Sequence, residues 1–159
     1  MCIRDRIVKL AASLGIEIPI LGGHTLVKNT VLEAAAGSDV QLYVSTFYQE
    51  GGSPEFDEGF KAWLSEDSTA MTNNGGNDTI AAVTAMGYDA YYVALEALKA
   101  AGSTDKAAVK AALPDVTYTG VSGSIAFDEQ GDAIRDTAYI KTADTANNAW
   151  TLETVQTVE

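Results

Sequence analysis

Apolar positions in the first third of the chain switch between the spacing of a helix and that of a strand. Between Ile7 and Leu14 they recur every three or four residues, which predicts an amphipathic helix with its buried stripe on Ile7, Val8, Leu10, Ala11 and Leu14, ended by Gly15. Strands are predicted over 16–21 and 40–47, and a short helix over 29–36. Strand, helix and strand in this order imply a right-handed crossover and a parallel sheet.

The middle of the chain has helical spacing and recognisable helix ends. Ser53 at the N-cap and Pro54 after it start a helix, and its buried stripe is predicted to be Phe56, Phe60, Trp63 and Leu64. Asp78 is predicted to cap a helix of about 23 residues that ends at Gly102. Its predicted inner face comprises Ile80, Val83, Gly87, Tyr91, Ala94, Leu95 and Leu98.

Shorter elements follow these helices. The polar stretch 67–78, rich in glycine and asparagine, is predicted to be a loop, and Thr104 is predicted to cap a helix over 105–113 that ends at Pro114. Strand-like runs cover 121–127, 133–142 and 149–155. The first two runs are separated by 128–132 and predict an antiparallel pair, so an α/β segment is followed by helices and an antiparallel tail.

Charge and composition exclude several classes of function. The 159 residues include 47% hydrophobic side chains and carry a formal net charge of −12, which disfavours binding to nucleic acid or to anionic lipid. No apolar run of about 18 residues is present, so membrane insertion is not predicted. Residues 1–6 do not resemble a secretory signal, and we interpret them as a non-native start in which Cys2 has no partner for a disulfide.

The sequence predicts no catalytic centre, no metal site and no cofactor. His24 is the only histidine, and no Gly-x-Ser-x-Gly motif or phosphate-binding loop accompanies it. Asp128, Gln130 and Asp132 have the spacing that begins an EF-hand loop, but Ala133 and Tyr139 occupy its required glycine and glutamate positions. We therefore predict a protein that is not an enzyme.

Other polar and aromatic residues have ordinary structural explanations. From the residues alone, Tyr88 is expected to pack at the edge of the core and Asp89 to be exposed, whereas ligand contact stays open for His24 because it follows a predicted parallel strand. Packing is also predicted for Trp63, Tyr91, Tyr92 and Trp150.

A series of motifs in one order carries a resemblance to a known family. The sequence reads Ile-Pro-Ile-Leu-Gly-Gly at 18–23, Tyr-Val-Ser-Thr at 43–46, Gly-Tyr-Asp-Ala at 87–90 and Phe-Asp-x-x-Gly-Asp at 127–132. Together these motifs resemble the C-terminal half of a periplasmic solute-binding protein of the branched-chain amino acid (Leu/Ile/Val) ABC transporter type. The resemblance extends from about Ile7 to Glu159.

The resemblance implies a partial type I periplasmic-binding-protein-like α/β fold. Wound parallel sheet segments would come from two lobes, with an antiparallel C-terminal tail. It implies that 7–47 ends the second lobe, 48–133 forms the C-terminal part of the first lobe and 134–159 returns to the second. Relatives place a polar or acidic ligand-binding residue after the Ile-Leu-Gly-Gly strand, which corresponds here to His24 or Thr25. Relatives also place a cleft-facing residue where Tyr88 lies.

The function implied is the binding component of an ABC importer for amino acids or related small solutes. The ligand would sit between two lobes, the partners would be the transporter's membrane subunits, and the location would be periplasmic, with the signal peptide missing from this chain. In relatives the residue that corresponds to His24 or Thr25 contacts the ammonium group of the ligand. A histidine does not supply a carboxylate's charge for that contact, so a carboxylate-bearing or amide ligand fits better than an ordinary α-amino acid. The alternatives are a sensor domain of the same fold, a small cytosolic α/β enzyme that uses His24, and a fragment that binds nothing and associates through open sheet edges.

Overall fold

The chain forms two compact units, each of which has its own core. The computed structural model describes residues 3–157; Cys2 and the very start of the stretch interpreted as non-native lie outside that range. Unit 1 extends up to Phe47 and resumes at Thr137, and unit 2 comprises Tyr48–Asp136. The polypeptide therefore passes from one unit to the other twice.

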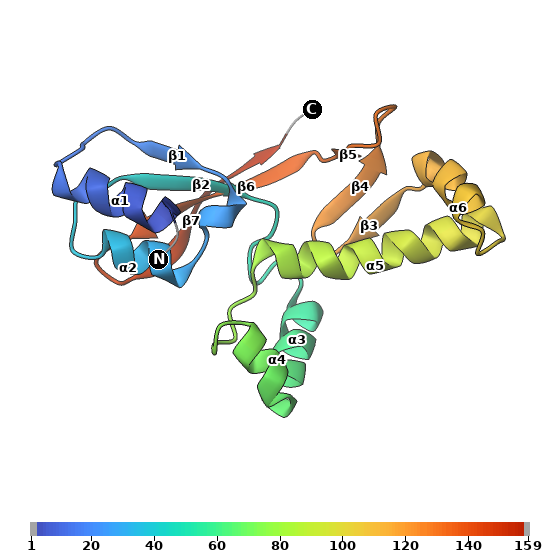
Figure 1. The fold of residues 1–159 in the computed structure, drawn as a ribbon, viewed down its shortest axis with the longest axis horizontal. Helices are drawn as coiled ribbons and strands as arrows, with labels where there is room; N and C mark the ends of the chain where they lie inside the picture. The colour runs from blue at the N-terminus through green and yellow to red at the C-terminus, as the bar shows by residue number, and fades with distance from the viewer. Residues whose placement is uncertain (1–2, 158–159) are drawn as a thin grey trace. The chain divides into compact units, whose positions relative to one another are not determined.

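Unit 1 is an α/β unit built from both ends of the chain (Figure 1). Its elements are α1 (Ile3–Ser13), β1 (Ile20–Gly22), the 3₁₀ turn η1 (His24–Leu26), α2 (Asn29–Ala35), β2 (Leu42–Thr46), β6 (Thr137–Asp144) and β7 (Ala149–Thr157). The strands form one sheet in the order β1-β2-β6-β7.

The pairing within this sheet is mixed. β1 and β2 are parallel, with Ile20 opposite Leu42, which confirms the parallel pair predicted from strand–helix–strand order. β6 pairs antiparallel with both β2 and β7, and an irregularity between Ile140 and Lys141 shifts the β6–β7 register. The antiparallel tail thus extends a parallel pair into a four-stranded mixed sheet.

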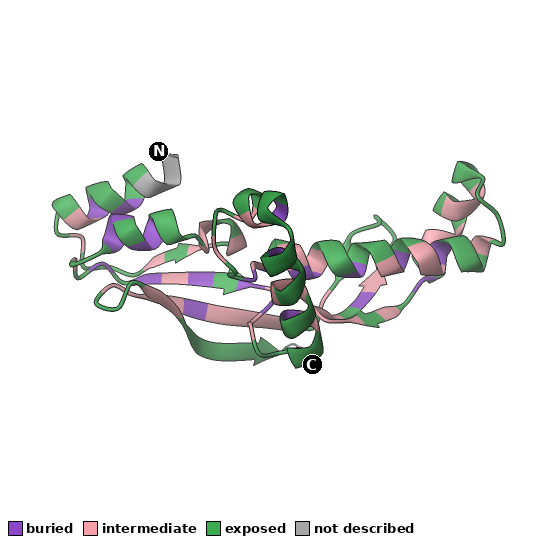
Figure 2. Ribbon diagram, turned by 90° about the horizontal axis from the view of Figure 1, so that it is seen from below, coloured by how far each residue is buried: buried purple, intermediate pink, exposed green. Residues whose placement is uncertain are grey.

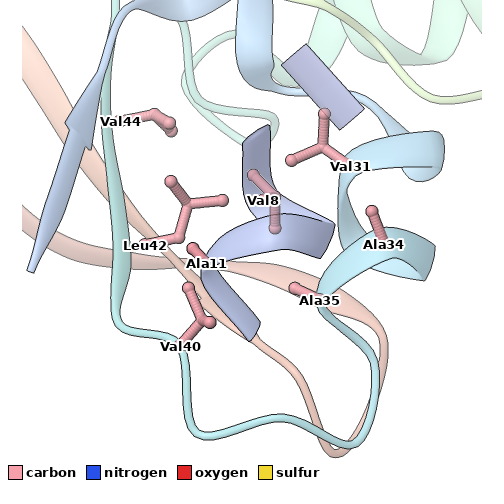
Figure 3. Close-up of a cluster of buried hydrophobic side chains, with 8 residues drawn as sticks. All are labelled: Val8, Ala11, Val31, Ala34, Ala35, Val40, Leu42 and Val44. Carbon is pink, nitrogen blue, oxygen red and sulfur yellow. The ribbon is translucent and has the colours of Figure 1, made fainter. Parts of the chain in front are cut away.

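The core of unit 1 lies between the sheet and two helices on the same face (Figure 2). Figure 3 shows the cluster of Val8, Ala11, Val31, Ala34, Ala35, Val40, Leu42 and Val44. Trp150 of β7 packs against it, as predicted. The predicted stripe of α1 is wrong in part, because Ile7, Leu10 and Leu14 are exposed and only Val8 and Ala11 face α2 and β2.

Unit 2 combines helices with a small antiparallel sheet. Its elements are α3 (Pro54–Glu66), α4 (Ser68–Asn73), α5 (Ala82–Ala101), α6 (Lys106–Ala112), the 3₁₀ turn η2 (Leu113–Asp115), β3 (Tyr118–Gly120), β4 (Gly123–Phe127) and β5 (Ala133–Ile134). The strand order is β3-β4-β5, and both pairs are antiparallel. The long helix α5 runs alongside β3 (Figure 1).

The buried face of α5 differs from the predicted one. Its buried residues are three alanines, one valine and one aspartate, namely Ala82, Ala85, Asp89, Val93 and Ala97. Val83 and Tyr91 are exposed, as are Gly87, Ala94 and Leu98, so the predicted inner face was wrong at these positions. Alanines on the inner face let the helix approach its neighbours closely, while Val83, Tyr91 and Leu98 remain exposed.

Several helix ends also differ from their predictions. Asp67 accepts hydrogen bonds from the amides of Thr69 and Ala70 and starts α4 inside the predicted loop. The long helix begins at Ala82 rather than after Asp78, and Asp105 caps α6 in place of Thr104. Ser53 does occupy the N-cap of α3, but its side chain forms no capping hydrogen bond. An aspartate that reaches two amides at once is a stronger cap than a neighbouring threonine.

The burial of Trp63 and the predicted strand 133–142 also differ from expectation, because both depend on contacts between distant parts of the chain. Trp63 is half exposed, so its predicted burial was wrong, whereas Leu64 is buried as predicted and Asp57 is buried in addition. The predicted strand 133–142 is split after Ile134, because its start pairs with β4 in unit 2 and its remainder enters the sheet of unit 1 as β6. The predicted hairpin around 128–132 therefore exists only as the two-residue β4–β5 pair.

Candidate functional site

His24 and Thr25 lie where the parallel strands of unit 1 end. β1 ends at Gly22, and η1 begins at His24 immediately afterwards. The His24 ring is 5.9 Å from the ring of Phe47, which directly follows β2. Both residues are thus at the carboxyl edge of the parallel pair, the edge at which α/β sheets bind ligands.

The turn that carries His24 is held by its own backbone. The amide of Leu26 donates to the carbonyl of Gly23 at 3.0 Å, and the amide of Val27 donates to the carbonyl of His24 at 3.1 Å. His24 is half-buried and Thr25 is exposed. An imidazole and a hydroxyl on an ordered turn can each donate or accept a hydrogen bond, which suits recognition of a carboxylate or an amide.

Tyr88 belongs to unit 2 and sits among aromatic side chains. Its ring centre is 4.9 Å from those of Phe56 and Tyr92, and its hydroxyl donates to the Tyr92 hydroxyl at 3.3 Å. That hydrogen bond, and to a lesser extent burial, raises the pKa of Tyr88 to about 12. Tyr88 therefore offers a neutral hydroxyl and a ring face at physiological pH.

A shallow groove in unit 2 includes Tyr88. It has a volume of about 420 Å³ and is open to solvent. Its lining comes from α3, α5 and the turn after β3, and comprises Ser53, Glu55, Phe56, Gly59, Phe60, Trp63, Tyr88 and Val121. Half of these lining residues are aromatic, so the groove suits a flat or apolar group more than a strongly charged one.

The sequence prediction missed Asp89, a buried carboxylate of unit 2 that accepts several hydrogen bonds. It is fully buried, and its carboxylate accepts from the amides of Val121 at 2.9 Å and Ser122 at 2.8 Å. The hydroxyl of Ser122 donates to the same carboxylate at 2.5 Å, and Arg135 donates to both the carbonyl and the hydroxyl oxygen of Ser122. The expectation that Asp89 is exposed was therefore wrong.

Asp57 is a second buried carboxylate that the sequence did not single out. It accepts a hydrogen bond of 2.5 Å from the Tyr48 hydroxyl and one of 2.6 Å from the amide of Gly51. Burial, and then the hydrogen bond to Asp57, raises the pKa of the Tyr48 hydroxyl well above its ordinary value. Asp57 follows Pro54 in the first turn of α3, so the sequence indicated only a favourable helix-dipole charge there.

The raised tyrosine pKa values predict a loss of stability in alkali. Above about pH 10 tyrosines in the unfolded chain ionise, whereas Tyr48 and Tyr88 stay protonated in the folded chain. The folded state then binds more protons, so the free energy of unfolding should fall as the pH rises from about 10 toward 12. Urea unfolding at pH 8 and pH 11 measures this slope.

The variant Tyr48→Phe separates the contribution of Tyr48 to this pH dependence from that of Tyr88. Removal of a hydrogen bond to a carboxylate should cost about 2 kcal/mol at pH 8, where both tyrosines are protonated. The loss of stability between pH 8 and pH 11 should be smaller than in the parent chain, because phenylalanine does not ionise. An unchanged pH dependence would refute the role given to Tyr48.

The three sequence-predicted site residues lie in two separate groups. His24 and Thr25 are neighbours on η1 in unit 1, and Tyr88 is on α5 in unit 2. Across residues 3–157 no group of three or more potential metal ligands occurs. No helix within the same range is long and apolar enough to span a membrane.

A sequence-family model and several solved structures match this chain. Residues 6–148 match the sequence family described as "Periplasmic binding protein". No curated protein matches the chain by sequence. The crystal structure of a leucine binding protein from Thermotoga maritima is similar over 97% of this chain, with 26% identity and a TM-score of 0.74.

Two other solved structures broaden the comparison. A substrate-binding protein from Desulfitobacterium hafniense in complex with leucine has 26% identity over 92% of this chain and a TM-score of 0.60. A solute binding protein from R. palustris in complex with benzoate has 15% identity over 98% of it and a TM-score of 0.66. The chain spans 41%, 39% and 41% of the lengths of these three proteins. The resemblance and the partial α/β fold predicted from the sequence are confirmed.

Proposed function

Since this chain belongs to the periplasmic binding protein family, we propose that it is the C-terminal part of the binding component of an ABC importer. The solutes would be amino acids or related small molecules. The observation that carries the proposal is the match of 97% of the chain to a leucine binding protein at a TM-score of 0.74. Solved structures with this fold include complexes with leucine and with benzoate, so the fold accommodates carboxylates with different side groups.

The proposed mechanism is capture without chemistry. Residues 7–47 and 134–159 would belong to one lobe and 48–133 to the other, and the ligand would be held between the completed lobes. Closure around the ligand is a hinge motion in which no covalent bond forms or breaks. The closed form would then dock on the membrane subunits of the importer, outside the cytoplasm.

The residues proposed to contact the ligand are His24, Thr25 and Tyr88. His24 and Thr25 lie at the carboxyl edge of a parallel strand pair, and Tyr88 presents a neutral hydroxyl beside an aromatic groove. None of the three provides a fixed negative charge for an ammonium group. We therefore favour a solute recognised through a carboxylate or an amide, with an apolar or aromatic remainder.

The test begins with the coding DNA upstream of Met1. A reading frame that continues upstream supplies the longer protein, which is then screened by thermal shift against leucine, isoleucine, benzoate and simple amides. A ligand at 100 times its dissociation constant should stabilise the protein by about 2.7 kcal/mol. A stop codon directly upstream, with no shift for any of these solutes, would overturn the proposal.

Variants of the same protein test the contact residues. Loss of one hydrogen bond to a charged ligand group should weaken binding about 10- to 100-fold for His24→Ala, and by less for Thr25→Ala, measured by titration calorimetry. Thr104→Ala, an exposed threonine in the turn before α6, is the matched control and should bind normally. Equal affinity of all three variants would remove His24 and Thr25 from the site.

A further inference from the structure

The loop between α4 and α5 contains a chemically reactive pair of residues. Its sequence at 73–77 is Asn-Asn-Gly-Gly-Asn, and Asn74 is the one asparagine of the chain that a glycine follows. The side-chain amide of an asparagine can be attacked by the backbone nitrogen of the next residue, and a glycine has no side chain to shield that nitrogen. Asn74 is therefore the asparagine most open to loss of its amide group.

The side chain of Asn74 holds this loop together. Asn74 is the C-cap of α4, and its Nδ2 donates to the carbonyl of Asn77 at 2.7 Å and to the carbonyl of Thr79 at 3.1 Å. Both bonds need a donor, which a carboxylate in the same place does not have. One NH₂ group thus joins the end of α4 to the segment that leads into α5.

That segment continues directly into the core of unit 2. Ile80 follows Thr79, and it is buried together with Ala82, the first residue of α5. Both side chains belong to the apolar cluster that includes Tyr48 and Ala85. The loop that Asn74 holds therefore sets where this part of the core begins.

The two reacting groups are both occupied in the folded loop. The backbone N–H of Gly75 donates to the carbonyl of Thr72 at 3.0 Å, and Nδ2 of Asn74 has its two carbonyl partners. Attack requires that the Gly75 nitrogen is free, has lost its proton and lies against Cγ of Asn74. The loop must therefore open first, and because Gly75 and Gly76 are exposed, that opening uncovers little apolar surface.

We propose that Asn74 is a site of spontaneous deamidation and that the reaction releases the loop irreversibly. The Gly75 nitrogen gives its proton to solvent and forms a bond to Cγ of Asn74, while the bond from Cγ to Nδ2 breaks and Nδ2 leaves as ammonia. Water then opens the cyclic imide to an aspartate or an isoaspartate. The net change is an amide and water to a carboxylate and ammonium, with no oxidation or reduction.

The product does not restore the folded loop. A carboxylate at position 74 would place acceptor oxygens against the carbonyls of Asn77 and Thr79, where the folded loop has a donor. The loop then stays open next to Ile80. The reaction needs neither a solute nor any other part of a binding protein, so it does not depend on the proposed function.

The first experiment uses the chain without any substitution. The protein is incubated at pH 7 and pH 9, and each asparagine is followed by peptide mapping with fragmentation mass spectrometry. Asn74 should convert faster than Asn147 and Asn148, and faster at pH 9, because the attacking nitrogen must lose its proton. In urea, where the loop no longer restrains the reacting groups, its rate should rise at least about tenfold.

Two variants test the role of the loop. Asn74→Asp reproduces the product, so hydrogen–deuterium exchange of the peptide covering 74–82 should become about tenfold faster. Asn77→Ala removes the acceptor of the Thr79 amide and the bond to the carbonyl of Gly75, so Asn74 should deamidate faster. Asn147→Ala, which removes a side-chain bond to Asp144 in unit 1, is the control and should change neither quantity.

Each of these measurements can overturn the inference. Conversion of Asn74 no faster than that of Asn147 or Asn148 would exclude it as a modification site. An equal rate in the folded and urea-unfolded chain would show that the loop does not control the reaction. Unchanged exchange in Asn74→Asp would show that the side-chain donor does not hold the loop.

Discussion

Replacing Asp89 with alanine is expected to lower the free energy of unfolding of unit 2 by about 3–5 kcal/mol. The side chain is fully buried, and its removal leaves the amides of Val121 and Ser122 and the Ser122 hydroxyl without their acceptor. Each of these donors would lose a hydrogen bond to a charged group. Few single substitutions in unit 2 should cost as much.

Urea unfolding followed by tryptophan fluorescence provides the measurement. In a Trp150→Phe background Trp63 is the remaining tryptophan and reports on unit 2 alone. Asp105→Ala is the matched control, since Asp105 also accepts two backbone amides but is exposed, and its loss should cost about 1 kcal/mol. Similar losses for the two variants would show that burial of Asp89 is unimportant.

Gly120→Ala is expected to destabilise unit 2 by about 3 kcal/mol. A Cβ at this position would lie 2.1 Å from one carboxylate oxygen of Asp89 and 2.6 Å from the other. The carboxylate cannot move aside without breaking its bonds to the turn after β3, so the strand or the helix must shift. Glycine at 120 is therefore required for the close approach of β3 to α5, and urea unfolding of the variant measures the cost.

The two predictions are linked, which allows a sharper test. In an Asp89→Ala background the clash at Gly120 disappears, so Gly120→Ala should then lower the free energy of unfolding much less. The double variant should therefore be more stable than the sum of the two single losses predicts. Gly87→Ala is the control, because its Cβ meets nothing within 4 Å and alanine favours a helix by up to about 1 kcal/mol. Additive losses for Asp89 and Gly120 would contradict the contact.

Local sequence was a good guide to the elements and to several of their ends. Gly15 and Gly102 have positive φ angles at the ends of α1 and α5, as their positions predicted. The parallel β1–β2 pair followed from the order of elements, and the turn with His24 follows β1 as expected. These features depend on residues close together in the chain, so a single sequence contains the information they need.

Side-chain burial was predicted less well, for a definite reason. The largest apolar residues on α1 and α5 were assigned to the core, but Leu10, Leu14 and Tyr91 are exposed and alanines face inward. Small residues let neighbouring helices and strands approach each other closely. A prediction that weights each position by its hydrophobicity instead assigns the largest apolar residues to the core. A search for a stripe of small residues would have placed Asp89 on the buried face.

The sequence by itself determined the class of fold, most of the helices and strands and the family resemblance, because these depend on local propensity and on motif order. Only the tertiary structure decided the role of Asp89, which is bonded to residues more than 30 positions away, and the splitting of 133–142 between two sheets. Contacts between distant parts of the chain leave no periodic pattern, and their geometry exists only once helix and strand are packed together.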